Sequence, residues 1–234
     1  LMPGLVWVGA WLMWSRLAPE DRATRGALIL GCGLGNTSFV GFPLTTAYFG
    51  EEGLRIAVVC DQITFLLLST VGVALSISHG QGHRQRGILA SLFRFPPFLG
   101  FLIALLAPGV VSYGGLPELW KPLADTLVPV ALFSVGLQLE VSSQAFDRLL
   151  GWGILYKLLL APALIMGLLW GAGASGLVAK VTVLEASMAS MATTSVLAVQ
   201  YGLNSRVSSL LIGVGVPLSL LTSYGWYRLV QLVF

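Results

Sequence analysis

The sequence has very little charge for its length. Of its 234 residues, 10% are Asp, Glu, Lys or Arg and 56% are hydrophobic, and the mean hydropathy is +0.86. A soluble domain carries charge on about 25% of its residues, so this chain has too few charges to cover a surface in water. The scarcity excludes a soluble globular domain. Because strands of alternating polarity are also lacking, the sequence predicts an all-α membrane protein.

Residue patterns that carry catalytic chemistry are scarce as well. The chain has two cysteines and two histidines, and no histidine follows His83. Residues 173–176 read Gly-Ala-Ser-Gly, the pattern of rhomboid-type intramembrane serine proteases, but such a protease needs a histidine base in a later helix. There is no His-Glu-x-x-His motif for a zinc protease and no Walker A lysine motif for an ATP-driven pump. The sequence therefore predicts that the protein is not an enzyme and needs no cofactor.

The basic residues predict an orientation in a membrane rather than a nucleic-acid partner. The net charge is +3, yet these residues are scattered over short loops and form no stripe with interleaved aromatics. One set of alternating loops carries eight arginines and the other set four basic residues. The richer set is cytoplasmic by the positive-inside bias. We therefore expect a lipid bilayer as partner, specifically the plasma membrane, which is the inner membrane in a bacterium.

Apolar segments recur along the chain and predict about eight spanning helices in a single transmembrane domain, residues 1–234. Most of them approach the roughly 20 residues that cross a ~30 Å hydrocarbon layer. They are residues 1–14, 26–50, 54–78, 95–108, 124–139, 149–171, 181–201 and 207–226.

Two parts of the sequence resemble each other when Gly50 is aligned with Gly202. Each part has a polar patch, an apolar half-helix that ends in an aromatic residue and glycine, and an arginine that opens the next span. Three consecutive helices repeat in this way, and an odd number places the two copies in opposite orientations across the bilayer. Residues 1–85 would be the remainder of the first repeat and residues 86–234 the second. Chance similarity among leucine-rich helices is the alternative.

The second repeat contains two helices, within residues 95–139, that have no counterpart in the first. Their counterparts would lie upstream of residue 1, which is a leucine. We therefore expect the natural protein to have two further amino-terminal helices, about 60 to 80 residues, and ten helices in all.

Both copies of the repeat carry polar residues and helix breakers inside an apolar segment. A helix in hydrocarbon breaks only where protein covers it or a cavity lies beside it, because unpaired backbone groups are costly there. The N-terminal end of each half-helix offers N–H donors and partial positive charge to an anion. We expect the two breaks to cross and form one polar site. The first break is predicted from Gly31, Gly33, Gly35, Asn36, Thr37, Ser38 and Pro43, and the second from Ser187, Ser190, Thr193, Thr194 and Ser195.

Three charged residues lie inside the predicted spans and away from the first two residues of each span. Glu185 and Asp61 are intramembrane carboxylates, which are costly unless paired or hydrated and are therefore functional candidates. A solvated or arginine-paired structural role is the alternative for Asp61. We expect Lys157 to extend its side chain to the cytoplasmic interface, the alternative being that it neutralises an acid or an anionic substrate. Helix–helix hydrogen bonding is the alternative for Asn36, Thr37 and Ser38.

Three segments resemble the auxin efflux carrier family of permeases. GNTSFVGFPLTTAYFGEEGLRIAVVCDQ is similar to the fourth and fifth helices of that family, LVPVALFSVGLQLE to the seventh, and LEASMASMATTSVLAVQYGLNSRVSSLLIG to the ninth and tenth. The resemblance covers the whole chain from the third helix onward. It implies the ten-helix inverted-repeat fold of the bile/arsenite/riboflavin transporter superfamily, which bile acid:sodium symporters share. In that fold two broken helices cross in a core domain beside a panel domain.

The resemblance also implies roles for single residues. It maps the first crossover to Asn36, Thr37 and Pro43, and the intramembrane acids to Asp61 and Glu185. The family commonly has Pro and then Asn in the second crossover, where this chain has Ala189 with Ser190, and Thr193. Without that proline we expect a gentler second break. The predicted substrate-binding residues are Asn36, Thr37, Ser38, Pro43, Ser190, Thr193 and Thr194, and the predicted coupling-ion residues are Glu185, Asp61 and Asn36.

The predicted function is secondary active transport of a small organic anion by alternating access. The resemblance implies a carboxylate such as malate, malonate or an indole acid. The coupling ion is a proton, shuttled by Glu185, or sodium, bound by oxygens of Glu185, Asn36 and Thr193. A sodium-coupled carrier like the bile acid symporters and a passive anion channel are the alternatives. The sequence leaves a homodimer open.

Overall fold

A computed structural model shows how the chain folds. It describes residues 1–17, 21–80 and 148–234, together with isolated positions between 99 and 133. The predicted spans at 95–108 and 124–139 lie outside the continuous described ranges. Within those ranges the secondary structure is helical, apart from one isolated bridge between Gly35 and Ser190. The all-α prediction is confirmed for this part of the chain.

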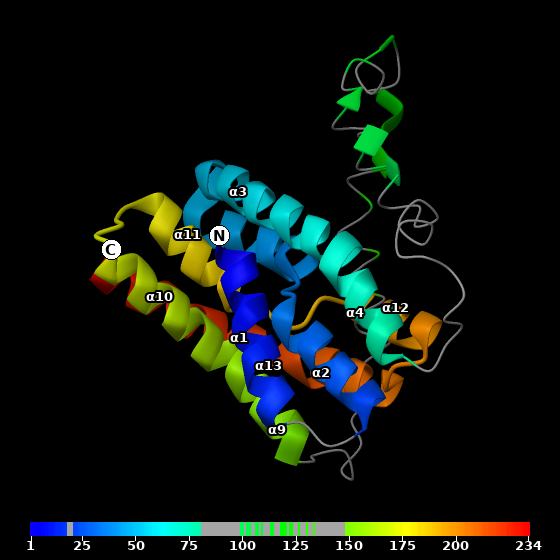
Figure 1. The fold of residues 1–234 in the computed structure, drawn as a ribbon. Helices are drawn as coiled ribbons and strands as arrows, with labels where there is room; N and C mark the ends of the chain where they lie inside the picture. The colour runs from blue at the N-terminus through cyan, green and yellow to red at the C-terminus, as the bar shows by residue number, and fades with distance from the viewer. Residues whose placement is uncertain are drawn as a thin grey trace.

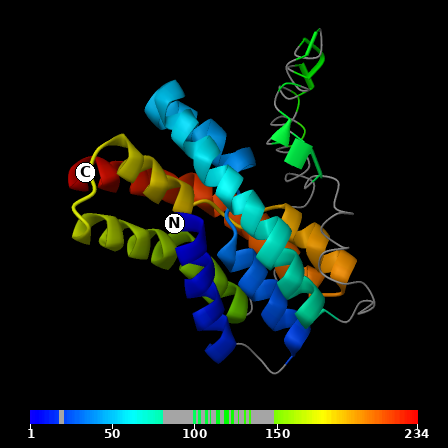
Figure 2. The ribbon, with the colours of Figure 1, turned by 45° about the horizontal axis from the view of Figure 1, so that its top comes forward.

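The helices pack against one another, and both ends of the chain lie at the surface (Figures 1 and 2). Three of the segments, η1 to η3, are π-helical turns. In chain order the elements are α1 (Met2–Leu17), α2 (Arg22–Gly33), η1 (Thr37–Gly41), α3 (Phe42–Leu67), η2 (Leu68–Gly72), α4 (Val73–His79), α9 (Arg148–Leu155), η3 (Tyr156–Leu160), α10 (Ala161–Gly171), α11 (Leu177–Ala186), α12 (Thr193–Tyr201) and α13 (Ser205–Val233).

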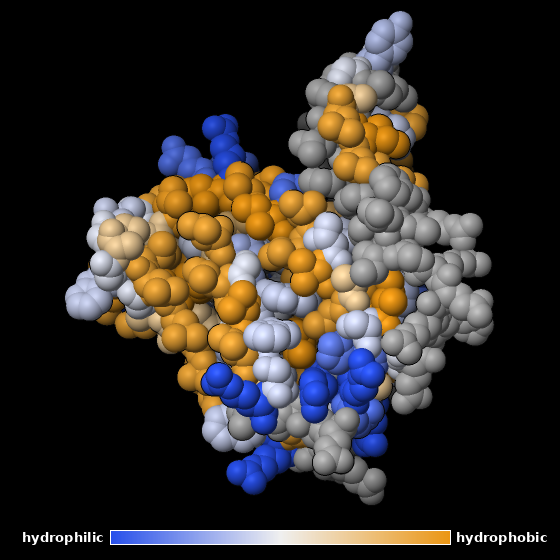
Figure 3. Space-filling view, viewed as in Figure 1, coloured by the Kyte–Doolittle hydropathy of each residue, from blue (hydrophilic) through white to orange (hydrophobic). Residues whose placement is uncertain are grey.

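Three continuous helical stretches of the described chain are long and apolar enough to cross a membrane. They are Thr37–His79, Arg148–Gly171 and Ser205–Val233. Figure 3 shows the face of the molecule seen in Figure 1. Hydrophobic residues cover much of this face, and the most hydrophilic residues lie toward its margins. The surface pattern agrees with a membrane protein, whereas the count of eight spans and the inverted repeat stay predictions.

Gly50 divides the longest of these stretches where the sequence predicted the end of one span. It has φ 68° and ψ −163°, a conformation that residues with a Cβ rarely adopt, and it kinks α3. A Cβ built on Gly50 would have no atom within 4 Å, so backbone conformation rather than packing requires glycine there.

Two glycines predicted to unwind the first broken helix instead pack inside it. Gly31 and Gly33 belong to α2, and a Cβ on Gly31 would press on Leu211 of α13, while one on Gly33 would press on Trp7 of α1. Small residues let neighbouring helices approach closely, which is the main source of packing energy where lipid and protein are equally apolar. The prediction that these two glycines form the break is therefore wrong.

Pro43 also lies outside the break. It falls in the first turn of α3, and the π-helical turn η1 runs directly into it. Proline has no N–H to donate, and π-helical bonding in the turn before it accommodates that loss without ending the helix. Pro43 therefore shapes the helix that follows the break, contrary to the prediction that it interrupts the helix.

Large apolar side chains from α1, α2, α11 and α13 fill the interior. Trp14, Leu30, Leu184, Leu211 and Ile212 are each at most 1% exposed. The Trp7, Trp11 and Trp14 stripe divides: Trp7 and Trp14 pack inward and Trp11 is 48% exposed. This interior surrounds and covers the break after α2.

We predict that Gly50→Ala lowers the free energy of unfolding by about 1–3 kcal/mol, because alanine is strained at this positive φ while nothing there obstructs its methyl group. The matched control is Gly167→Ala inside α10, where space is equally open but the backbone is helical. That control should be neutral or stabilising. Unfolding in detergent, followed by circular dichroism, measures both. Equal effects of the two substitutions would contradict the strain argument.

Candidate functional site

Two helices stop deep in the protein, and the chain resumes as a helix a few residues later. The first interruption lies between Gly33 at the end of α2 and Thr37 at the start of η1. The second lies between Ala186 at the end of α11 and Thr193 at the start of α12. We call the meeting point of these two segments, residues 34–36 and 187–192, the crossing.

The two interrupted segments pair with each other at Gly35 and Ser190 in an antiparallel bridge. The Asn36 N–H donates to the Ala189 carbonyl at 2.7 Å, and the Met191 N–H donates to the Leu34 carbonyl at 3.1 Å. Each segment thus supplies hydrogen bonds that the other lost when its helix ended. The breaks are stable because they occur together.

The absence of a proline predicted a gentler second break, and this prediction is wrong. The second break is at least as complete as the first, because the whole of residues 187–192 lies outside the helices. Hydroxyl groups satisfy the carbonyls that this break exposes. Ser187 Oγ donates to Leu184 O at 2.7 Å, and Thr194 Oγ1 donates to Met191 O at 2.7 Å. Serine and threonine therefore take the place of a proline as helix breakers here.

Asn36 is fully buried at the crossing and caps the helix that follows it. Its Oδ1 accepts a hydrogen bond from the Phe39 N–H at 3.1 Å, and its carbonyl accepts one from the Gly41 N–H at 3.1 Å. Its Nδ2 has no hydrogen-bond partner among the described residues. A buried amide with unused donors is costly unless a ligand or water meets it.

Glu185, one residue before the end of α11, is also fully buried. Its Oε1 accepts a hydrogen bond from Thr45 Oγ1 at 2.7 Å, while its Oε2 has no partner in the described part of the chain. The carboxylate lies against Gly41, where an added Cβ would collide with both oxygens. Gly41 in η1 thus leaves the space that the acid occupies.

Asp61 lies in α3 beside the start of η1 and is 9% exposed. Its Oδ1 accepts a hydrogen bond from Thr37 Oγ1 at 2.7 Å. Among the described residues Asp61 thus bonds a hydroxyl and pairs with no arginine. This arrangement ties the helix after the first break to the second half of α3.

Lys157 does not extend to the membrane interface, contrary to the prediction. It is 2% exposed, and its Nζ donates to the Ala186 carbonyl at 3.4 Å, at the end of α11. A Cβ on Gly35 would lie 3.1 Å from this Nζ. The π-helical turn η3, just before Pro162 in α10, thus directs a buried ammonium to the crossing.

The structure therefore brings most of the predicted site residues together. Asn36, Thr37 and Ser38 follow the first break, Ser190 pairs with Gly35, and Thr193 and Thr194 begin α12. Pro43 is the exception, since it is half-buried in the first turn of α3.

Three residues at the crossing were absent from the predicted site. Thr45 and Gly41 showed no sequence signal beyond their place in the segment that follows the break. Lys157 did carry a signal, because any ionisable residue inside an apolar span is a functional candidate. Its distance from the end of the span did not reveal that its side chain reaches the crossing.

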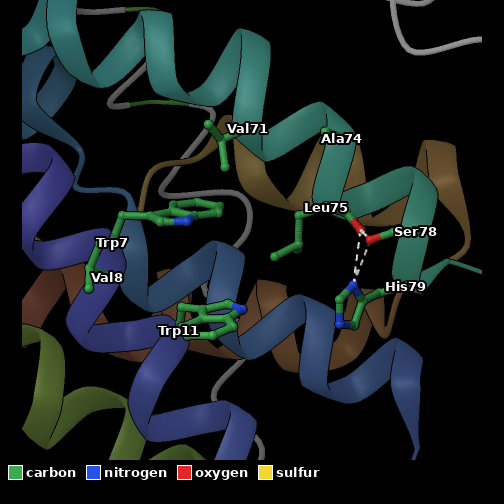
Figure 4. A pocket seen from close by; sticks show the side chains of 8 residues that line it. All are labelled: Trp7, Val8, Trp11, Val71, Ala74, Leu75, Ser78 and His79. Carbon is green, nitrogen blue, oxygen red and sulfur yellow. Dashed lines mark hydrogen bonds between the residues drawn. The ribbon is translucent and has the colours of Figure 1, made fainter.

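Two of the cavities on the described surface are large, and neither is lined by Asn36 or Glu185. A cavity of about 520 Å³ lies between α1 and α4, where Trp7 and Trp11 face Leu75 and His79 (Figure 4). A second, of about 740 Å³, is lined by α1, α3, α10 and α11 and reaches Cys60, the neighbour of Asp61. The crossing is closed to both cavities.

Comparison with known proteins assigns the chain to a family. A family model described as membrane transport protein matches residues 85–227. An uncharacterized transporter of Methanocaldococcus jannaschii is 31% identical over 87% of this chain and 68% of its own length. One of Methanothermobacter thermautotrophicus is 31% identical over 92% of this chain and 71% of its own length.

The chain belongs to the membrane transport protein family, that of the auxin efflux carriers. The resemblance noted in the sequence is confirmed, and the protein is a membrane-embedded permease. The crossing is therefore the candidate transport site of this permease.

We predict that Thr45→Val lowers the free energy of unfolding of the permease by about 1–3 kcal/mol, because the buried Glu185 carboxyl loses its hydroxyl donor. Thr45→Ser keeps the hydroxyl and should recover most of the loss. Thr70→Val is the matched control, since that hydroxyl donates to the Leu66 carbonyl of its own helix. Thermal unfolding in detergent ranks the variants. A Thr45→Val effect no larger than that of Thr70→Val would contradict the assignment.

Proposed function

We propose that this permease is a secondary active carrier that moves a small organic anion, such as a mono- or dicarboxylate, across the plasma membrane by alternating access. The observation that carries the proposal is the crossing, where two interrupted helices pair through their main chains in the buried interior. Broken helices that meet inside the membrane form substrate and ion sites in many secondary transporters.

The donors at the crossing suit an anionic group. The helices η1 and α12 both begin there, and the N-terminal end of a helix carries partial positive charge and free N–H groups. The Asn36 Nδ2 adds a buried donor without a described partner. A carboxylate would satisfy such donors without a dedicated binding loop.

Glu185 is the proposed coupling group. Its Oε2 is buried without a described partner, and a proton or a bound cation would supply one. A proton relay needs only the carboxyl of Glu185. Sodium needs further oxygen ligands, and we propose Asn36 Oδ1 and the Thr193 hydroxyl for this role. Asp61 is the second proposed coupling residue.

The predicted inverted repeat supplies the mechanism of movement. Gly50 and Gly202, which the repeat aligns, both have positive φ, at 68° and 72°, and each ends the half-helix that follows a break. This correspondence supports two related copies of one unit. The core that contains both breaks would then move against the panel and expose the crossing to either side.

An occluded site favours a carrier over a channel. Asn36 and Glu185 are each 0% exposed, so the described chain covers both side chains. A channel conducts through an open path, whereas a carrier passes through closed states.

Uphill accumulation tests the proposal. We expect the purified full-length protein in proteoliposomes to concentrate labelled malate, malonate or indole-3-acetate when a proton or sodium gradient is imposed. Accumulation with sodium alone would identify a sodium-coupled carrier, and flux that only dissipates the anion gradient would show a channel and contradict the proposal.

Glu185→Gln separates the two coupling ions. If Glu185 carries a proton, the variant should still exchange anion across the membrane but lose its response to a pH gradient. If the side chain binds sodium, the variant should lose its sodium dependence. Glu51→Gln is the matched control, because Glu51 is exposed near the kink at Gly50. A Glu185→Gln protein with unchanged coupling would remove Glu185 from the mechanism.

A further inference from the structure

Lys157 and Glu185 are oppositely charged side chains that reach the same crossing from different elements. Lys157 comes from η3 and is 2% exposed, and Glu185 comes from α11 and is 0% exposed. Lys157 lies against Gly35 and the Ala186 carbonyl, whereas Glu185 lies against Gly41 and Thr45. They are close enough to interact electrostatically but do not form an ion pair in the described structure.

The ammonium of Lys157 has hydrogen-bonding capacity to spare. An ammonium offers three donors. Among the described residues one of them is used, by the Ala186 carbonyl at 3.4 Å, which is long for an N–H···O bond. Because Gly35 has no side chain, the ammonium reaches the main chain of the crossing directly. Lys157 is therefore a buried cation beside the proposed substrate site with two donors available.

Charge balance links the two residues. A buried net charge is costly in a membrane, so the interior favours states in which the charges of the site sum to zero. When both side chains are ionised and the site is empty, the charges of this pair balance each other, and the proposal takes the protonation of Asp61 to stay the same throughout. A bound monovalent anion adds one negative charge, and a proton on Glu185 restores the balance.

Glu185 is better placed than its neighbours to accept that proton. It is faced by Lys157 from η3 and by Asp61 and Cys60 from α3, while Cys32 of α2 faces Lys157. Asp61 already accepts a hydrogen bond from Thr37, whereas Glu185 Oε2 accepts none from the described chain.

We propose that Lys157 binds the carboxylate of the substrate, and that Glu185 takes up one proton for each anion bound. This inference rests on the proposed function and deepens it. Lys157 and the anion then form the ion pair that Glu185 gives up when it is protonated. A monocarboxylate crosses with one proton and no net charge. In the proposed alternating-access cycle, the anion reaches Lys157 when the core moves against the panel.

Lys157→Met tests the binding role. We expect it to lower the apparent affinity for labelled malate, malonate or indole-3-acetate by about tenfold to a hundredfold, the loss of one charge-assisted hydrogen bond. Lys157→Arg should retain part of the uptake because it keeps the charge. Lys180→Met is the matched control, since that lysine is on the surface and donates to Gln231. An apparent affinity unchanged in Lys157→Met would overturn the proposal.

The wild-type protein tests the coupling without any substitution. A pH-sensitive dye inside proteoliposomes and labelled indole-3-acetate outside should report one proton for each anion, and a potassium–valinomycin potential should not change the rate. Glu185→Gln should bind the anion, ignore the pH gradient and respond to the potential. Uptake that follows the potential without proton movement in the wild type would overturn the proposal.

Different results would overturn the proposed function and the roles of Lys157 and Glu185. A wild-type protein that neither binds nor moves any of the three anions would overturn the proposed function and this inference with it. A wild-type protein that accumulates one of them, with Lys157→Met equally active, would overturn the inference alone. Size-exclusion chromatography and thermal unfolding establish that the Lys157→Met protein is folded, and the wild-type proton count decides the coupling if it is not.

Discussion

The need of every backbone N–H and C=O for a hydrogen-bond partner in an apolar interior governs this structure. A helix that ends there leaves donors and acceptors without partners, and a single break would be costly. Two breaks that meet can satisfy each other, as Asn36 does with Ala189 and Met191 with Leu34. The polar site therefore exists only as a pair of interruptions, which neither segment could form alone.

The residues around the crossing follow from this pairing. The two main chains can come together only where side chains are small, and Gly35 and Ser190 meet at the bridge itself. Gly41 leaves room for the carboxylate of Glu185, and Gly35 for the ammonium of Lys157. Glycine at these two positions thus lets opposite charges approach the crossing in a protein with few charges.

Proline acts at one remove from the site. Pro43 and Pro162 each follow a π-helical turn, η1 and η3, and neither ends a helix. A π-turn rotates the residues it contains relative to a regular helix. In η1 the turn carries Gly41 against Glu185, and in η3 it carries Lys157 to the crossing. The π-helical turn before each proline thus sets the direction in which Gly41 and Lys157 face.

The sequence by itself determined that the protein is helical and membrane-embedded, because a lack of charge leaves lipid as the surrounding solvent. It also located both interruptions, because Asn, Thr and Ser inside apolar segments are costly unless they satisfy backbone groups or bind a ligand. Only the tertiary structure decided which glycines bend the chain and which merely admit a neighbour. Gly31 and Gly33 make room for Leu211 and Trp7, and contacts between distant segments cannot be read from either one. The tertiary structure also decided the position of Lys157. A long side chain in a span can reach either the interface or the interior, and the π-helical turn η3, which contains Lys157, directs it to the interior.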